Sequence, residues 1–173
     1  GMFSGTGITS IPSGFLPATT LTTACYRNMF SRTKITSIPS KLLQVTTLQK
    51  ECYDAMFYYC TSLTTVPSNL LPATTLAESC YSSMFMFCSS LTTAPNLPAT
   101  TLVKGCYNQM FKDSSKVNYI KCLATDISAT SCTSNWTKSV ASSGTFVKNS
   151  SMSSWTTGVN GIPSGWTVQT ASS

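Results

Sequence analysis

Cysteine is the residue of this chain with the widest chemical repertoire. The sequence contains eight cysteines and no histidine. Without an imidazole, neither a Ser-His-Asp triad nor a Cys-His pair can form, and histidine-bound metal sites are excluded. No two cysteines have the C-x-x-C spacing of zinc sites or thioredoxin-type redox centres. We therefore expect no metal and no cofactor. The eight are Cys25, Cys52, Cys60, Cys80, Cys88, Cys106, Cys122 and Cys132.

Charged side chains are too few and too scattered to form a catalytic site. The 173 residues include five Asp and Glu and eleven Lys and Arg, and the net charge of +6 arises because acids are scarce. The cations stand singly, whereas nucleic-acid surfaces cluster them. No uninterrupted apolar run approaches the roughly 18 residues of a membrane span. These features predict a protein that is not an enzyme, binds no nucleic acid and has no membrane span in this part of the chain.

An internal repeat organises the sequence. Cys-Tyr pairs begin at residues 25, 52, 80 and 106, and a Met-Phe pair follows each of them. A period of 26 to 28 residues predicts stacked units, none of which can bury its apolar face alone. Residues 2–13 repeat residues 29–40 almost letter for letter. The first unit is therefore incomplete, and we expect the chain to be a piece of a longer protein.

Each unit is predicted to contain a short helix followed by a short parallel strand. On a helical wheel of residues 76–88 the apolar side chains share one face, which includes Phe87. The Thr-Thr pairs that begin at residues 19, 46, 74 and 100 precede each apolar stretch, where a hydroxyl caps a helix well. The segment of residues 63–67 is short, contains β-branched residues and ends in proline, which is typical of a strand that forms one rung of a solenoid.

The repeat resembles that of a known family. The string Met-Phe-x-x-Cys-x-Ser-Leu-Thr-Thr-Val at residues 56–66, with a second copy at residues 84–94, is similar to the Ala-Phe-x-x-Cys-x-x-Leu-x-x-Ile repeat of the BspA-like leucine-rich-repeat surface proteins of Bacteroidetes. The resemblance covers residues 2–125. It implies a helix-plus-strand solenoid, a cell-surface or secreted location, and a role in adhesion, and it supplies no catalytic residues.

The predicted architecture is accordingly α/β. We expect a leucine-rich-repeat-like, right-handed solenoid of about four and a half units over residues 1–139, followed by an irregular C-terminal cap over residues 140–173. The three tryptophans, Trp136, Trp155 and Trp166, lie towards the C-terminus. They are expected to close the last repeat, and a ligand-stacking platform is the alternative.

The cysteines are expected to be buried free thiols. Their even number fits a disulfide framework if the protein is exported. Cys60 and Cys88, however, occupy equivalent places in successive units, so their side chains point in parallel rather than at each other. The cysteines that precede tyrosine lie on the predicted apolar face, where cysteine behaves as a small hydrophobe.

The candidate ligand face is a set of hydroxyl and phenol side chains. Threonines that repeat along successive strands would form a polar ladder able to hydrogen-bond a glycan or a peptide, although their β-propensity alone also explains them. Two tyrosines between the Phe and Cys of one unit would project outward. The candidate residues are Thr36, Thr64, Thr65, Thr92, Thr93, Tyr58 and Tyr59.

Two functions follow from this pattern. The first is a non-catalytic adhesion module that binds a host or neighbouring-cell surface protein or glycan through the repetitive face. The second is a structural spacer that presents another domain and has no ligand of its own. In either case the unpaired edge of the first unit is expected to allow weak self-association.

Overall fold

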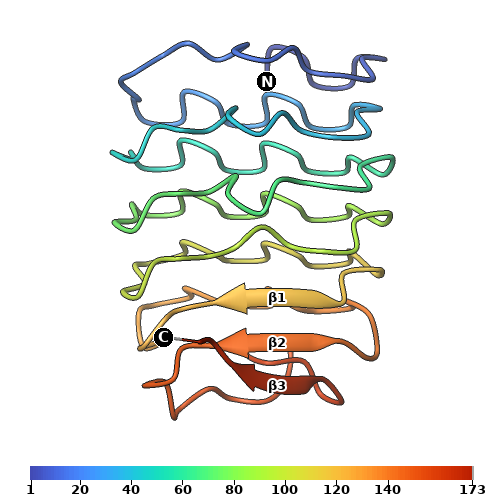
Figure 1. The fold of residues 1–173 in the computed structure, drawn as a ribbon. Coiled ribbons are helices and arrows are strands. Elements are labelled where there is room, and N and C mark those ends of the chain that lie inside the picture. The colour runs from blue at the N-terminus through green and yellow to red at the C-terminus, as the bar shows by residue number, and fades with distance from the viewer. Residues whose placement is uncertain (173) are drawn as a thin grey trace.

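A computed structural model describes residues 1–172 and shows a column of stacked coils, each about one sequence repeat long (Figure 1). The regular strands lie at the C-terminal end of the column. They are β1 (Tyr119–Cys122), β2 (Thr145–Lys148) and β3 (Thr167–Thr170), which form a parallel sheet in the order β1-β2-β3. In the earlier coils the sheet is continued by isolated parallel bridges, such as that between Ser37 and Thr65.

The apolar stretch of each repeat is a run of consecutive tight turns. In residues 48–60 the backbone N–H groups donate alternately within a turn and to the next coil. The Met56 N–H donates to the Tyr53 carbonyl, three residues back, at 3.2 Å, and the Phe57 N–H donates to the Met84 carbonyl of the next coil at 3.1 Å. Because half of these bonds join neighbouring coils, one repeat cannot complete the pattern alone.

Every fourth residue of these turns has a left-handed backbone. The φ angle is 55° at Glu51, 50° at Ala55 and 58° at Tyr59. An α-helix needs a right-handed backbone throughout, with each N–H bonded four residues back. Residues 1–172 contain no helix, so the predicted α/β, leucine-rich-repeat-like solenoid of helix-plus-strand units is wrong. The Thr-Thr pairs that we expected to cap helices precede turns instead.

Side chains in the turns point inward and outward in pairs. The buried residues are Leu48, the pair Cys52 and Tyr53, and the pair Met56 and Phe57. The two residues that follow each pair are more exposed. The pattern therefore has a period of four. On a wheel drawn with 3.6 residues per turn, residues four apart drift by about 40° per step. Three such steps stay within roughly 120°, which is why the stretch resembled an amphipathic helix.

The inward pairs build continuous columns through the core. Equivalent aromatic rings in successive coils stack nearly parallel, with centroids 5.6 to 6.2 Å apart. Trp136 is fully buried and stacks on Tyr107, and Trp155 stacks on Trp136 at 5.6 Å. The coils continue past Trp136 through β2 and β3, so a closing role for the tryptophans stays a prediction. The columns are Tyr26, Tyr53, Tyr81, Tyr107 and Trp136, and Phe3, Phe30, Phe57, Phe85 and Phe111.

All eight cysteines are free thiols, and all but Cys25 are buried. One series gives a backbone carbonyl of the preceding coil a second donor, beside the backbone N–H from which it already accepts. The Cys88 thiol donates to the Phe57 carbonyl at 3.2 Å, and in the next coil the Ser114 hydroxyl donates to the Phe85 carbonyl at 2.6 Å. The position therefore needs a small donor rather than sulfur chemistry. Within residues 1–172 there is no helix long and apolar enough to cross a membrane.

Candidate functional site

The five candidate threonines lie on the outside of the column, directly after the turns. Thr36, Thr64, Thr65, Thr92 and Thr93 are all exposed, and we call this set the threonine ladder. The buried Leu63 and Leu91 directly precede Thr64 and Thr92. Their exposure is an observation, and the role of the threonines as a ligand face stays a prediction.

The ladder consists of two bonded runs. The Thr64 N–H and hydroxyl both donate to the Thr36 carbonyl, at 3.1 and 3.2 Å, and Thr65 pairs with Ser37 in a parallel bridge. In the following coils the Thr92 carbonyl accepts from the Asn118 N–H at 2.9 Å. Among the described residues Thr64 and Thr92 make no direct hydrogen bond to each other. The hydroxyls of Thr65 and Thr92 have no protein partner in the described chain, so they are free to bind a ligand.

An aromatic cluster lies at the corner before the ladder. The Tyr58 and Tyr59 rings are 6.1 Å apart, and the Phe87 ring of the next coil lies 5.8 Å from Tyr58 and 5.6 Å from Tyr59. Tyr59 is 48% exposed. We call these three residues the aromatic corner. The expectation that Phe87 belongs to the core is wrong, because the two-in, two-out pattern places it in an outward pair.

The aromatic corner is built on unfavourable backbone. The φ angle is 58° at Tyr59 and 61° at Phe87, a region that bulky L-residues rarely adopt. At the same place in other coils the chain has Arg32, Asp113 and Ser139, with φ between 57° and 61°. The fold therefore fixes the backbone at this position but not the side chain. An exact four-residue spacing, in place of a helical wheel, would have identified Phe87 as outward-facing.

Two cations extend the corner towards the N-terminus. The Arg32 guanidinium carbon lies 5.8 Å from the centre of the Tyr58 ring, within range of a cation–π contact. Arg32, Lys34, Tyr59 and Thr61 line a shallow hollow of about 470 Å³, together with the buried Thr33. Sequence reasoning missed both cations, because they stand in a different repeat from the tyrosines.

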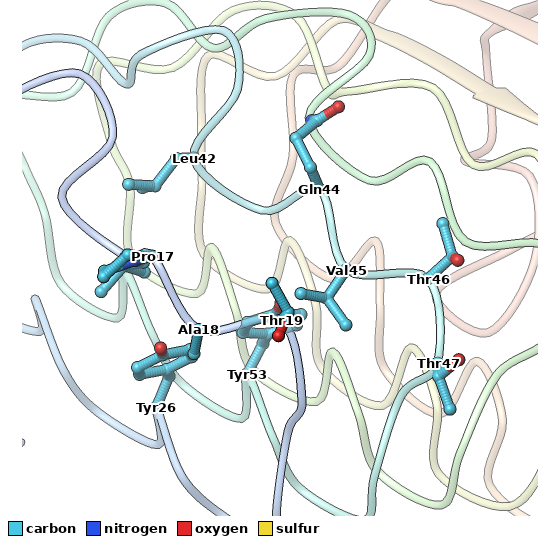
Figure 2. A pocket seen from close by; sticks show the side chains of 11 residues that line it. Pro17, Ala18, Thr19, Tyr26, Leu42, Gln44, Val45, Thr46, Thr47 and Tyr53 are labelled. Atoms are coloured by element: carbon cyan, nitrogen blue, oxygen red, sulfur yellow. The ribbon is translucent and has the colours of Figure 1, made fainter.

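A second polar region lies where the Thr-Thr pairs precede the turns. A hollow of about 420 Å³ lies between residues 16–19 of the first coil and residues 44–47 of the second, with Tyr26 and Tyr53 also lining it. Figure 2 shows the side chains around it. A neighbouring hollow of about 380 Å³ lies between Thr46 and Thr47 of one coil and the equivalent threonines of the next. No backbone hydrogen bond joins residues 16–19 to residues 44–47, which leaves the coils apart here.

Three of the five carboxylates, Glu51, Asp54 and Glu78, form ion pairs. Glu78 lies 3.2 Å from Lys104 and 3.3 Å from Lys50, and these ammonium groups hold the pKa of its carboxyl below the ordinary value. Burial raises the pKa of Asp54, although Arg27 at 3.0 Å opposes the shift. In the described part of the chain no three His, Cys, Asp or Glu side chains are close enough to hold a metal ion.

Burial also makes the thiols poor nucleophiles. It raises the pKa of Cys52 to about 11 and that of Cys106 and Cys122 to about 12. The thiolate is the reactive form of cysteine, and at neutral pH these thiols stay protonated. Their role in the described structure is to fill space and to donate to backbone carbonyls.

Comparison with known proteins found no match for the chain. No family model matches it, and no match was found among curated proteins or among solved structures. The likeness to BspA-like repeats therefore rests on the motif strings at residues 56–66 and 84–94 alone. Function has to be argued from the surfaces described above.

Proposed function

We propose that this chain is a non-catalytic interaction module of a cell-surface or secreted protein, which binds a surface protein or glycan through the threonine ladder. The observation that carries the proposal is the repetition of exposed hydroxyls along one side of the column. A regular stack of coils offers an extended surface on which weak contacts repeat, and repeat proteins use such surfaces for binding.

The chemistry of the ladder suits a polar partner. Each threonine hydroxyl supplies one donor and two acceptor positions, and the backbone behind the ladder is held by inter-coil bonds such as that between Thr64 and Thr36. Fixed hydroxyls lose little conformational freedom on binding, and preorganisation of this kind favours affinity. The aromatic corner adds apolar area next to the ladder. The proposed location at the cell surface is supported by the BspA-like motif strings.

Alanine substitution of the ladder tests the proposal. The variant carries Thr64→Ala, Thr65→Ala, Thr92→Ala and Thr93→Ala, and its binding to arrays of glycans and immobilised extracellular-matrix proteins is compared with that of the unaltered chain. The matched control replaces the same number of exposed threonines next to the second hollow, at residues 46, 47, 74 and 75. We expect the ladder variant to lose binding and the control to retain it, with the thermal unfolding midpoint unchanged in both.

The alternative is a spacer with no ligand of its own. The regular stacking of identical aromatic columns favours it, because such a column is suited to hold another domain at a distance. A spacer predicts no binding by the unaltered chain on either array. Loss of binding in the control variant alone would instead place the site at the threonine hollows and refute the ladder.

A further inference from the structure

Three aromatic side chains occupy positions where the fold does not require them. The outward pair is Tyr58-Tyr59 in one coil and contains Phe87 in the next, whereas the following coil has Lys112-Asp113 there. The inward residues on either side stay buried in each case. Positive φ recurs in the turns of every coil, for example at Glu51 and Ala55, so the backbone alone does not single out Tyr59 and Phe87. The side chain at this position differs between coils, which leaves it available for binding.

Two cations beside the aromatic corner have no carboxylate partner. The ion pairs of residues 1–172 involve Arg27, Lys50 and Lys104 only. Arg32 and Lys34 are exposed and take part in none of them. Both line the hollow beside Tyr59. The hollow therefore carries two positive charges that the protein itself does not neutralise, next to rings that offer apolar faces.

Two backbone N–H groups at this corner are engaged between coils. The Arg32 N–H donates to the Tyr58 carbonyl at 2.7 Å, and the Tyr59 N–H donates to the Met86 carbonyl at 2.8 Å. An extended peptide that adds to a sheet edge pairs with free backbone groups, and these two are occupied. The side chains that line the hollow offer a ring face, the Thr61 hydroxyl and two cations. A sugar unit with an acidic group matches this set better than a peptide strand.

We propose that the aromatic corner, with Arg32 and Lys34, is a subsite for an acidic sugar unit of a glycan that the threonine ladder holds. The apolar face of the sugar packs on Tyr59, and its carboxylate or sulfate pairs with the two cations. Arginine binds such planar or tetrahedral anions with two parallel hydrogen bonds. This inference rests on the proposed function, because it names the class of ligand for the same side of the column.

Titration of the full chain with three oligosaccharides of equal length tests the subsite. The probes are an oligouronate, a sulfated oligosaccharide and a neutral oligosaccharide, and the carboxylated and sulfated arms identify the source of the negative charge. We expect at least one acidic probe to bind at least tenfold more tightly than the neutral one. Added salt should reduce the difference, because it screens exposed charges.

Charge-matched variants separate a site from general attraction. Arg32→Gln with Lys34→Gln removes two charges at the subsite, and Lys112→Gln with Lys116→Gln removes two charges further along the column. Tyr59→Ser places there the residue that stands at the equivalent position 139. We expect the first and third variants to weaken acidic-probe binding at least tenfold and the second to weaken it less than twofold, with unchanged unfolding midpoints for both glutamine variants.

Each contrary outcome refutes a different part of the proposal. Equal losses in the two glutamine variants would show nonspecific attraction, and equal binding of an oligoglutamate peptide would show that the ligand class is wrong. If the ladder variant loses binding to a neutral glycan or a protein while Arg32→Gln with Lys34→Gln changes nothing, the subsite fails and the proposed function stands. If no probe, glycan array or matrix protein is bound by the unaltered chain, both fail.

Discussion

Replacing Ala55 with glycine tests the turn structure through the sign of the stability change. Ala55 has a φ of 50°, and a left-handed conformation costs an L-residue about 1–2 kcal/mol. Glycine avoids this cost but loses about 0.5–1 kcal/mol more conformational freedom on folding. The net expectation for Ala55→Gly is a gain of roughly 0.5–1 kcal/mol in the free energy of unfolding. In a helix interior the same substitution would lose about 1 kcal/mol.

Urea unfolding followed by circular dichroism measures the difference. With a slope of about 1–3 kcal/mol per molar urea, we expect the Ala55→Gly midpoint to rise by several tenths molar. Ala77→Gly is the matched control, since Ala77 is also partly buried in a turn segment but does not have a positive φ. Its midpoint should fall. A fall of similar size in both variants would refute the left-handed turns.

The reverse substitution strengthens the test. Gly105 occupies a left-handed position with a φ of 63°, and a Cβ added there would lie 2.7 Å from the Ser79 hydroxyl oxygen. Gly105→Ala should therefore lower the free energy of unfolding by about 1–2 kcal/mol. An unchanged midpoint for Gly105→Ala would contradict the left-handed backbone at this position.

Three further predictions concern side chains. Cys88→Ala should lower the free energy of unfolding by about 0.5–1.5 kcal/mol, because the Phe57 carbonyl loses its second donor and keeps the Cys60 N–H, whereas Cys88→Ser should retain most of the stability in the same urea assay. The pKa of Cys106 and of Cys122 is about 12, above the ordinary 9.0. The folded chain then keeps protons that the unfolded chain loses, so stability is full below about pH 9 and should fall by about 1.4 kcal/mol per thiol between pH 8 and pH 10; a flat profile would contradict it. Tyr59→Gly should raise the unfolding midpoint while abolishing acidic-glycan binding.

Sequence reasoning identified the repeat, its register and most of the core, because identical residues at a fixed period must stack. It failed on the local conformation. Leu76, Cys80, Met84 and Cys88 are spaced by four, and a wheel of 3.6 residues per turn still gathers them on one side. The feature that decides between turn and helix is the hydrogen bond from one coil to the next, as between Phe57 and Met84. A pattern read within one repeat does not contain it.

The sequence pointed to the residues of the candidate site without testing their role. The threonine ladder follows a buried leucine and is exposed, whereas Tyr59 is exposed and Tyr58 is half-buried; their part in binding stays a prediction. Phe87 was misassigned through the helical period, and Arg32 was not connected with the tyrosines because it stands one repeat earlier. The hollow of Figure 2 depends on how far residues 16–19 lie from residues 44–47. That separation is a property of the stacked coils and has no signal in the sequence.

The period of four separates inward pairs of residues, which build the core, from outward pairs, whose side chains can vary. Inward pairs such as Cys52-Tyr53 and Met56-Phe57 recur in the next coil as Cys80-Tyr81 and Met84-Phe85, because each ring must stack on its neighbour. The outward pairs meet only solvent or each other, so the fold restricts their backbone and leaves their side chains free. Non-glycine residues stand at left-handed positions throughout the turns, for example Glu51 and Ala55, so the backbone of Tyr59 is the one that the fold imposes there. Its exposed ring beside Arg32 and Lys34 is the feature on which the proposed acidic-sugar subsite rests.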